Sequence, residues 1–339
     1  MGCGRPVFVI AEIGVNHNGS IKLAKKMIDQ AAKAGADAVK FQSFKTDSII
    51  TRDAPSARYH LRATGGKESW FELLKRLELK EESHLELLRY CKNKGVVFLS
   101  TAYDQESADF LDKIGVCAIK ISSTDLNNIP LLKCVAAYGK PVILSTGMST
   151  MNEVRESVGA ILSKGNKKLI LMQCTANYPP DVKDASLNVI EAFRDKFNML
   201  VGYSDHLVSA QAAVAAVAKG ACVYEAHFTL DNNLPGPDHK SSATPAVLSR
   251  IVRDIRITER LLGSFEKRVT ASEKETRKKL RRSIVANRNI KAGVIIAKND
   301  IAVKRPGTGL PPKYYFLLMG KIAKRDIKKD SLINLRDVR

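Results

Sequence analysis

Two histidines end neighbouring apolar runs in the segment VGYSDHLVSAQAAVAAVAKGACVYEAHFTL (201–230). His206 follows one run, His227 lies near the end of the next, and a small-residue helical stretch separates them. Imidazoles on adjacent strands can converge on a borderline divalent metal and leave positions open for water and substrate. A single histidine is more often structural than a ligand, but this pair indicates a metal site.

Nearly all of the remaining apolar runs also end in groups that donate hydrogen bonds, carry charge or bind metal. These candidates are Glu12; Lys40 and Gln42; Thr101; Lys120, Ser122 and Ser123; Ser145 and Thr146; Gln173 and Thr175; Ser204 and Asp205; and Glu225. Alternation along a strand places Lys40 with Gln42 on one face. Two lysines with hydroxyls suit a phosphate and a carboxylate, and Glu12 is placed to carry a proton. Each signal is weak by itself, and their convergence predicts an active site.

The elements that must position these residues follow a regular alternation. The apolar runs are 7–15, 38–42, 96–102, 118–122, 141–147, 169–175, 199–205 and 222–229, with helical patterns between them. Eight strand–helix repeats, the last helix at about 244–262, indicate an α/β protein with a parallel (β/α)₈ TIM barrel, whose active site forms at the carboxyl ends of the strands. A doubly wound open sheet is the alternative. Eight equal repeats and the lack of a Gly-rich dinucleotide turn favour the closed barrel.

The composition of the chain divides it into three parts. Residues 1–263 form the predicted barrel, and 264–282 are polar and charged, as in a linker with some helix. Residues 283–339 carry short β-branched runs broken by Gly, Asn and Asp turns, which predict a small, mostly β domain. The insert at 47–80 is longer than a typical strand–helix connection and is predicted to lie over the active-site face. Trp70, in this insert, is interpreted as local packing.

The 339-residue chain has a net charge of +20, and residues 281–339 hold 15 Lys+Arg against 4 Asp+Glu. A solvated lysine-rich surface is the favoured interpretation, an anionic small substrate comes next, and nucleic-acid binding is disfavoured because no aromatic stacking pattern accompanies the charge. No apolar run has the length of a membrane helix, and the first residues do not resemble a secretion signal. Six cysteines without a C-x-x-C pair indicate reduced thiols, and hence a cytoplasmic protein.

Several short motifs together resemble the sialic acid synthase family. They are AEIGVNHNG, KFQ, LSTGM, GYSDH, HFTLD, GPDH and, near the end, VKRPGTG, in order from about residue 7 to 335. That family includes N-acetylneuraminate, legionaminate and pseudaminate synthases. The resemblance implies a barrel joined to a small C-terminal β-rich antifreeze-like (SAF, β-clip) domain. It also implies a domain-swapped homodimer in which the small domain caps the partner's active site.

The resemblance further implies a reaction and residue roles. The family condenses phosphoenolpyruvate with the open-chain aldehyde of an N-acyl mannosamine-type sugar, giving a nine-carbon 2-keto sugar acid and phosphate. It uses a divalent metal, most often Mn²⁺ and otherwise Mg²⁺ or Co²⁺, which His206 and His227 would hold. Phosphoenolpyruvate would be bound by Lys40, Thr101, Lys120, Ser123, Ser145 and Ser204. The catalytic residues would be Glu12, Lys40 and Lys120. The sugar contacts would be Gln42, Asp125, Tyr178, Asp238 and, from the partner chain, Arg305.

The sequence departs from the family pattern on the sugar and phosphate side. Asp125, in ISSTD, replaces a longer Glu, and Ala176 stands where a polar residue is common. The choice among neuraminate, legionaminate and pseudaminate therefore stays open, although the 47–80 insert and DHKSS are more similar to bacterial or archaeal legionaminate and neuraminate synthases than to the animal 9-phosphate enzyme. Two rival hypotheses are another phosphoenolpyruvate-condensing barrel acting on an aldose phosphate, and a non-catalytic carbohydrate- or nucleic-acid-binding protein that uses the basic tail.

Overall fold

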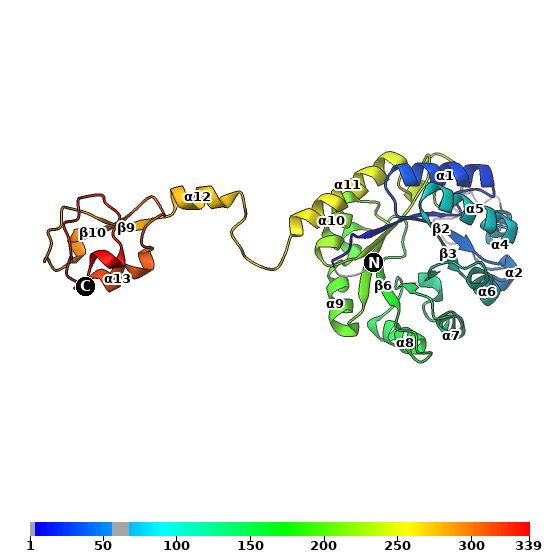
Figure 1. Cartoon of the computed structure of the whole chain (residues 1–339). Coiled ribbons are helices and arrows are strands. Elements are labelled where there is room, and N and C mark those ends of the chain that lie inside the picture. Colours follow the sequence, from blue (N-terminus) through cyan, green and yellow to red (C-terminus); the bar gives the residue numbers. More distant parts are fainter. Residues whose placement is uncertain (1–3, 56–67) are drawn as a thin grey trace. The chain divides into compact units, whose positions relative to one another are not determined.

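The computed structural model describes residues 4–55 and 68–339, and the chain divides after Gly263 into two compact units. In the first unit, eight parallel strands form a closed barrel in chain order (Figure 1). The strands are β1 (Phe8–Gly14), β2 (Ala38–Ser43), β3 (Val97–Ala102), β4 (Ile119–Ile121), β5 (Val142–Ser145), β6 (Leu169–Cys174), β7 (Leu200–Asp205) and β8 (Val223–His227). Because β1 pairs with β8 from Phe8↔Val223 to Glu12↔His227, the sheet has no free edge. The predicted (β/α)₈ barrel is confirmed, and the open-sheet alternative is wrong.

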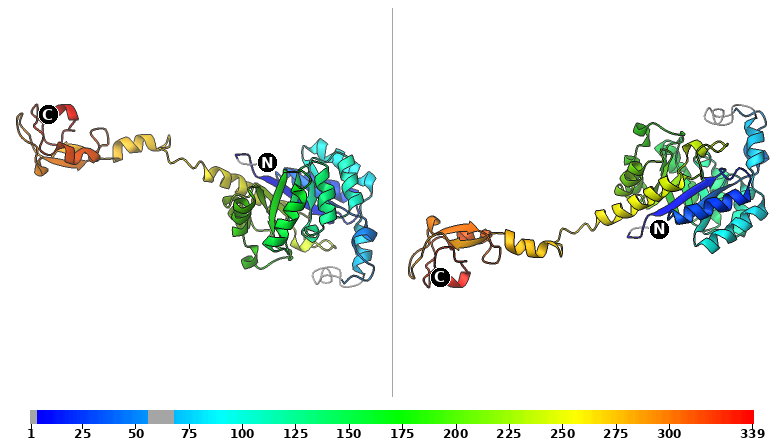
Figure 2. Two further views of the ribbon diagram at one scale, coloured as in Figure 1. Left: turned by 90° about the horizontal axis from the view of Figure 1, so that it is seen from below. Right: turned by 90° about the horizontal axis from the view of Figure 1, so that it is seen from above.

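Helices surround the strands, as the two further views also show (Figure 2). They are α1 (Ile21–Lys33), α2 (Thr46–Ile49), α4 (Trp70–Leu77), α5 (Glu81–Lys94), α6 (Gln105–Lys113), α7 (Ile129–Ala137), α8 (Met151–Leu162), α9 (Asn188–Phe197), α10 (Ala210–Ala218) and α11 (Pro245–Leu262). Several of these helices begin at a capping side chain: Ser20 accepts a backbone hydrogen bond at the start of α1, and Thr150 and Glu153 form a capping box at the start of α8. No helix in the described parts of the chain is long and apolar enough to cross a membrane.

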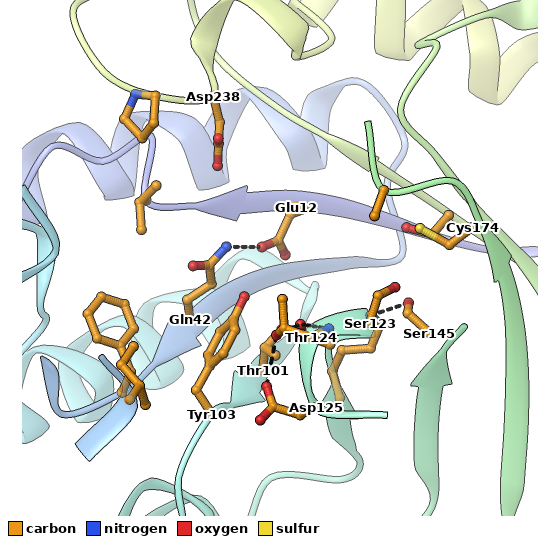
Figure 3. A pocket seen from close by; sticks show the side chains of 18 of the residues that line it. Glu12, Gln42, Thr101, Tyr103, Ser123, Thr124, Asp125, Ser145, Cys174 and Asp238 are labelled. Atoms are coloured by element: carbon orange, nitrogen blue, oxygen red, sulfur yellow. Dashed lines mark hydrogen bonds between the residues drawn. The ribbon is translucent and has the colours of Figure 1, made fainter. Parts of the chain in front are cut away.

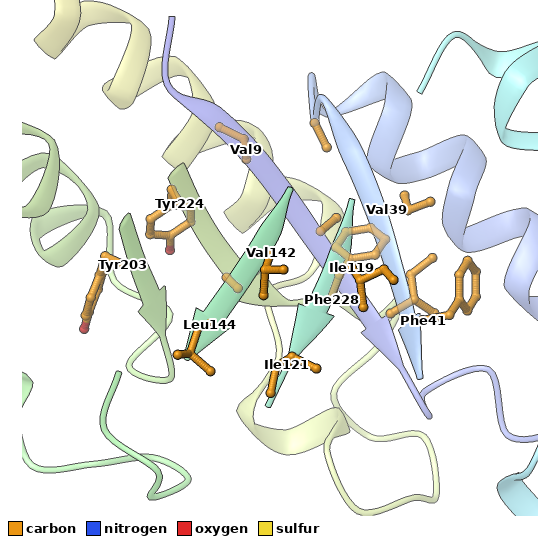
Figure 4. Close-up of a cluster of buried hydrophobic side chains, with 14 of the residues drawn as sticks. Val9, Val39, Phe41, Ile119, Ile121, Val142, Leu144, Tyr203, Tyr224 and Phe228 are labelled. Carbon is orange, nitrogen blue, oxygen red and sulfur yellow. The ribbon is translucent and has the colours of Figure 1, made fainter. Parts of the chain in front are cut away.

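Alternation along the strands separates two apolar layers. One set of positions, including Val9, Val39, Phe41 and Leu144, packs against the helices (Figure 4). The other set forms the barrel interior, and its buried members are Ile10, Ala38, Leu99, Ala118, Ile143, Ile170, Met172 and Val223. In most strands the next inward position, two residues closer to the carboxyl end, is polar. In β1, for example, the inward Ile10 is followed by the inward Glu12. The apolar interior of the barrel therefore gives way to polar side chains toward the carboxyl ends of the strands.

The inward position of β7 is Gly202, and its neighbours leave no room for a side chain. A Cβ at this residue would lie 2.4 Å from the Met172 sulfur and 2.8 Å from the Val223 carbonyl oxygen. These distances are shorter than van der Waals contact, so only glycine lets β7 approach β6 and β8 this closely. The strand that carries Ser204 depends on this approach.

The second unit, Ser264–Arg339, has a small core of its own. It contains α12 (Glu273–Leu280), an antiparallel pair of β9 (Ser283–Ala286) and β10 (Ile301–Lys304), and α13 (Tyr315–Leu318). Isolated bridges join Val285 to Leu332, Ile290 to Ile327, Ile295 to Ile322 and Ala323 to Val338. Short antiparallel pairings around buried Ile284, Ile290 and Ile333 give the β-rich character predicted from the turn-broken runs.

Candidate active site

A cavity of about 690 Å³ opens at the carboxyl ends of the barrel strands. Every barrel residue to which the family resemblance assigns a role lines this cavity: Glu12, Lys40, Gln42, Thr101, Lys120, Ser123, Asp125, Ser145, Tyr178, Ser204, His206, His227 and Asp238. Figure 3 shows several of them around the cavity, with Gln42 donating a hydrogen bond to Glu12. Residues far apart in the sequence therefore meet in one place, as the strand-end argument expects.

Two lysines and two carboxylates form the buried floor of the cavity. Lys40 contacts the Glu12 carboxylate and donates to Thr101 Oγ1 at 2.8 Å. Lys120 donates to Ser145 Oγ at 2.6 Å. The Glu225 carboxylate lies between the lysines, 3.8 Å from Lys40 Nζ and 3.6 Å from Lys120 Nζ. Opposite charges held this close compensate part of the large desolvation cost of burying each ion.

The pKa values of the two carboxyl groups, Glu12 and Glu225, are shifted in opposite directions. Burial raises the pKa of Glu12 to about 7, against the attraction of Lys40, and repulsion by Glu225 adds to the rise. Burial acts in the same sense on Glu225, but Lys120 and Lys40 outweigh it and hold the pKa of Glu225 below its usual value. Near neutral pH, Glu12 can therefore exchange a proton while Glu225 remains charged, a division of roles typical of acid–base sites. Burial also lowers the pKa of Lys120.

The two histidine rings lie close together in the cavity, with centroids 5.4 Å apart and ring planes inclined by 56°. The Tyr178 ring stacks on His206 at 4.1 Å and meets His227 edge-on at 5.5 Å. His206 Nδ1 lies 2.8 Å from the Thr175 carbonyl oxygen, which can only accept, so Nδ1 carries a proton, and in the neutral ring Nε2 keeps the lone pair. His227 Nδ1 is buried without a hydrogen-bond partner, and the Asp238 carboxylate is 3.7 Å away.

These features fit a divalent metal held by the two imidazoles. A backbone acceptor that fixes the tautomer is typical of metal-ligating histidines, and the His227 Nδ1 has no hydrogen-bond partner that would compete with an ion. Burial, with the charges of His206, Lys40 and Lys120, holds the pKa of His227 well below its usual value, in the neutral ligand form. Burial acts in the same direction on His206, but Cys174 and the Thr175 carbonyl raise its pKa overall. Among the described residues, no group of three or more His, Cys, Asp or Glu is placed to hold a metal ion together.

Asp125 and Asp238, two of the predicted sugar contacts, are half-buried carboxyl groups in the cavity. Burial raises the pKa of Asp238 to about 6, with His206 opposing the rise, and its backbone carbonyl accepts a hydrogen bond from Ser242 Oγ at 2.7 Å. The Asp125 carboxylate accepts from Thr124 Oγ1 at 2.9 Å and from Asn128 Nδ2 at 3.2 Å. Carboxylates of this kind are suited to accept hydrogen bonds from sugar hydroxyls.

Some strand-end candidates do not reach the cavity. Gln173 donates to the Ala185 carbonyl oxygen at 3.0 Å, and Thr175 donates to that of Asp184 at 2.8 Å. In β6 the cavity-facing residue is Cys174, two positions after the inward Met172. The phase of the inner layer could therefore have identified Cys174 from the sequence. Asp205 is structural: it accepts from the Tyr203 and Tyr224 hydroxyls and from three backbone N–H groups.

Other lining residues carry roles that the sequence did not assign. Glu225 is a strand-end candidate without an assigned role, yet it is the shared partner of both lysines. Tyr103, one residue past β3, lines the cavity and packs edge-on against Phe44 at 6.1 Å. Trp70 packs locally against the cluster of Phe44 and Leu74, as interpreted from the sequence, and it also lines the cavity. Arg305 is exposed in the second unit, and its entry into a partner's site stays a prediction.

Comparison with known proteins identifies the family. The sequence profile of the NeuB family matches residues 27–267, and that of the SAF domain matches 281–339. The chain belongs to the NeuB family. The N,N'-diacetyllegionaminic acid synthase of Campylobacter jejuni is 40% identical to it over 97% of this chain and 99% of its own length. The human N-acetylneuraminate-9-phosphate synthase is 36% identical over 98% and 93%.

Structural comparison agrees with this membership. The crystal structure of the N-acetylneuraminic acid (sialic acid) synthetase of Leptospira borgpetersenii in complex with citrate superposes on this protein with a TM-score of 0.72 at 33% sequence identity. The superposition covers 81% of the present chain and 94% of the Leptospira chain. The resemblance to sialic acid synthases, the barrel with a SAF domain and the assignment as an enzyme of this synthase class are confirmed. A non-catalytic binding protein is thereby disfavoured.

Proposed function

We propose that this NeuB-family enzyme condenses phosphoenolpyruvate with the open-chain aldehyde of an N-acyl mannosamine-type sugar, giving a nine-carbon 2-keto sugar acid and phosphate. The observation that carries the proposal is one cavity with buried Lys40 and Lys120 on its floor and His206 and His227 on its wall. The relatives named as legionaminic acid and N-acetylneuraminate-9-phosphate synthases support this reaction class.

The lysine floor is suited to phosphoenolpyruvate, which carries a phosphate and a carboxylate. In the free enzyme Lys40 and Lys120 are compensated by Glu12 and Glu225. A bound anion would neutralise part of the lysine charge that the two carboxylates neutralise in the free enzyme. Charge-assisted hydrogen bonds to that anion are stronger in a buried site than at the surface, because little water screens them. The hydroxyls predicted to share the anion stand beside the ammonium groups. Thr101 and Ser145 accept from them, and Ser204 donates to Glu225 at 3.3 Å.

Glu12 is suited to move the proton that the condensation requires. Its pKa of about 7 lets the same carboxyl give or accept a proton near neutral pH. Gln42 donates to its Oε1 at 3.2 Å and Lys40 contacts its other oxygen, so two neighbours fix the orientation of the carboxyl group. The condensation joins the methylene carbon of phosphoenolpyruvate to the aldehyde carbon, and the new alkoxide oxygen takes up a proton. Water adds to the carbon that bears the phosphate and gives up a proton, and the bond from that carbon to the phosphate oxygen then breaks, which releases phosphate and leaves the 2-keto group.

The metal is part of the proposal, and Mn²⁺ is the favoured ion. His206 and His227 would hold it, and when bound it would supply Lewis-acid polarisation of the sugar aldehyde. Tyr178, stacked on His206, fixes the plane of that ring. Gln42, Asp125, Tyr178 and Asp238 would bind the sugar. We further propose a cytoplasmic, domain-swapped homodimer in which Arg305 from the partner chain contacts the N-acyl group.

The test is identification of the product. Protein loaded with Mn²⁺ is incubated with phosphoenolpyruvate and N-acyl mannosamine-type sugars, and mass spectrometry should detect a nine-carbon keto acid. Lys120→Met should lower kcat/KM for phosphoenolpyruvate about 100-fold, because it removes a charged anion contact. The matched control, Lys133→Met on the exposed face of α7, should leave it unchanged. Turnover of aldose phosphates instead of N-acyl sugars would reject the proposal in favour of another phosphoenolpyruvate-condensing synthase.

A further inference from the structure

The segment between β8 and α11, residues 228–244, brings Asp238 into the active-site cavity (Figure 3). We call this segment the β8 loop. None of the described side chains donates a hydrogen bond to the Asp238 carboxylate, and His227 Nδ1 lies 3.7 Å from it. The position of this carboxylate therefore depends on how the backbone of the β8 loop is held.

Two buried side chains hold the backbone at Asp238. The Ser242 hydroxyl donates to the Asp238 carbonyl oxygen at 2.7 Å and accepts from Asn16 Nδ2 at 2.9 Å. Asn16 Nδ2 also donates to the Phe228 carbonyl oxygen at 3.0 Å. Because a carbonyl oxygen can only accept, this contact fixes which end of the Asn16 amide faces the loop. Asn16, between β1 and α1, is fully buried, so water cannot replace these hydrogen bonds.

The β8 loop meets the segment between β1 and α1 at a second point. Asn18 Nδ2 donates to the Pro235 carbonyl oxygen at 2.8 Å, and Asn18 Oδ1 lies 3.4 Å from His239 Nε2. His239 Nδ1 shares a hydrogen bond of 2.7 Å with Thr229 Oγ1. Gly236, with φ +147°, permits this approach, because a Cβ there would lie 2.7 Å from the His239 ring and 2.9 Å from Asn18 Oδ1.

These contacts join three motifs that are far apart in the sequence. AEIGVNHNG supplies Asn16 and Asn18, HFTLD supplies Thr229, and GPDH supplies His239. None of these four described residues lines the cavity, so they do not touch a substrate there. Their common effect is to fix the β8 loop, and with it Asp238, against the start of the barrel.

We infer that Asn16 and Ser242 are positioning residues for sugar binding, which act by holding the backbone that carries Asp238. This inference rests on the proposed function and deepens it, because Asp238 is the proposed sugar contact. Loss of either side chain would let the Asp238 backbone shift, and a misplacement of about 1 Å can cost on the order of a hundredfold in rate. The proposed phosphoenolpyruvate contacts Lys40 and Lys120 stand on β2 and β4, so their positions do not depend on these hydrogen bonds.

The first test measures the KM for each substrate with the full-length, Mn²⁺-loaded enzyme and the N-acyl sugar that wild type turns over best. Ser242→Ala should raise the KM for the sugar about tenfold or more, and the KM for phosphoenolpyruvate less than about twofold. Ser242→Thr keeps the hydroxyl and should leave the KM for the sugar near the wild-type value. Thr258→Val, which removes a buried hydroxyl that donates to the Asp254 carbonyl oxygen in α11, is the matched control and should change neither KM.

The outcomes separate this inference from the proposed function. Equal increases in both KM values for Ser242→Ala, or no increase, would overturn the inference while the proposed function stands. A wild-type enzyme that turns over no N-acyl sugar would reject the proposed function and, with it, a role of Asn16 and Ser242 in sugar binding.

The second test asks whether the two side chains act as one unit. Asn16→Ala should raise the KM for the sugar as much as Ser242→Ala does, because either change breaks the same connection. The double variant should then lose no more than either single variant. A double variant whose loss is the product of the two single losses would show that the residues act independently, which contradicts the inference.

A third measurement needs no substrate. The Ser241 backbone N–H donates to the same Asp238 carbonyl oxygen at 3.1 Å, so its hydrogen exchange reports how firmly this part of the β8 loop is held. Ser242→Ala should speed this exchange by about fivefold, the effect of one lost hydrogen bond, and Thr258→Val should not. Unchanged exchange in Ser242→Ala would overturn the inference whichever sugar the enzyme uses.

Discussion

The balance of four charges, Lys40, Lys120, Glu12 and Glu225, underlies the proposed chemistry. The sequence predicted that both lysines and Glu12 stand at strand ends, because their residue types and positions are readable along one strand. It could not predict that Glu225 lies within 4 Å of both lysines, since that contact joins strands distant in sequence and depends on barrel register. The raised pKa of Glu12 likewise follows from burial that no local pattern encodes.

A buried histidine beside the site should make stability depend on pH. His17 accepts a hydrogen bond from the Gly19 N–H on Nδ1, and burial, with the charge of His84, lowers its pKa from 6.5 to about 4. The unfolded chain therefore binds more protons between these values. The stability from neutral His17 is present above about pH 6.5 and is lost as the pH falls toward 4.

The measurement is urea unfolding of wild type and His17→Asn at pH 7 and pH 5. Between these conditions wild type should lose about 2 kcal/mol more stability than the variant. Equal losses in the two proteins would show that His17 does not titrate with a depressed pKa.

At the scale of elements, the strands' inner faces decide both packing and site. The eight repeats and the capping box of α8 were predictable, because each depends on local periodicity or a four-residue motif. The phase of β6 was predicted wrongly at Gln173 and Thr175, since a fully buried strand shows no apolar–polar alternation. The apolar side of the cavity formed by Ile49, Ile50 and Trp70 was not predicted either, because a single tryptophan in a long insert does not indicate which surface it faces.

The close packing of β7 gives a test at this scale. Gly202→Ala would place a methyl group against Met172 and the Val223 backbone, so we expect a loss of about 1–3 kcal/mol from overpacking. The same change should lower activity, because β7 carries Ser204. Gly159→Ala, in an exposed part of α8 where a Cβ meets nothing within 4 Å, is the matched control. It should be stabilising by up to about 1 kcal/mol. Similar unfolding curves for the two variants would contradict this description of the barrel interior.

The whole molecule consists of two units with separate cores. Composition predicted the change after Gly263, because a charged segment without apolar periodicity interrupts the repeats. The SAF match assigns the second unit to a known domain type. Among the basic residues of 281–339, Arg305 has a proposed role, as a sugar contact. The SAF match gives no role to the others. No single-chain pattern encodes the proposed homodimer, so this proposal needs its own test.

Complementation between two defective variants tests domain swapping. Glu12→Gln damages the barrel site and Arg305→Ala the predicted contribution of the partner chain, so each alone should be impaired. In mixed, re-equilibrated dimers one site carries both defects and the other neither. With random pairing about a quarter of wild-type activity should therefore return. A mixture of Glu12→Gln and His227→Ala, both in the barrel, is the control and should stay inactive. Failure of the first mixture to regain activity would show that Arg305 does not act across the dimer.

The most direct test of the central claim is phosphate release from phosphoenolpyruvate by the EDTA-stripped protein. It is measured with and without N-acyl mannosamine-type sugars, and with and without added Mn²⁺. We predict that release requires both sugar and metal, because His206 and His227 would hold the ion that polarises the aldehyde, while Lys40 and Lys120 would bind phosphoenolpyruvate. Release without sugar, or release unaffected by EDTA, would contradict it.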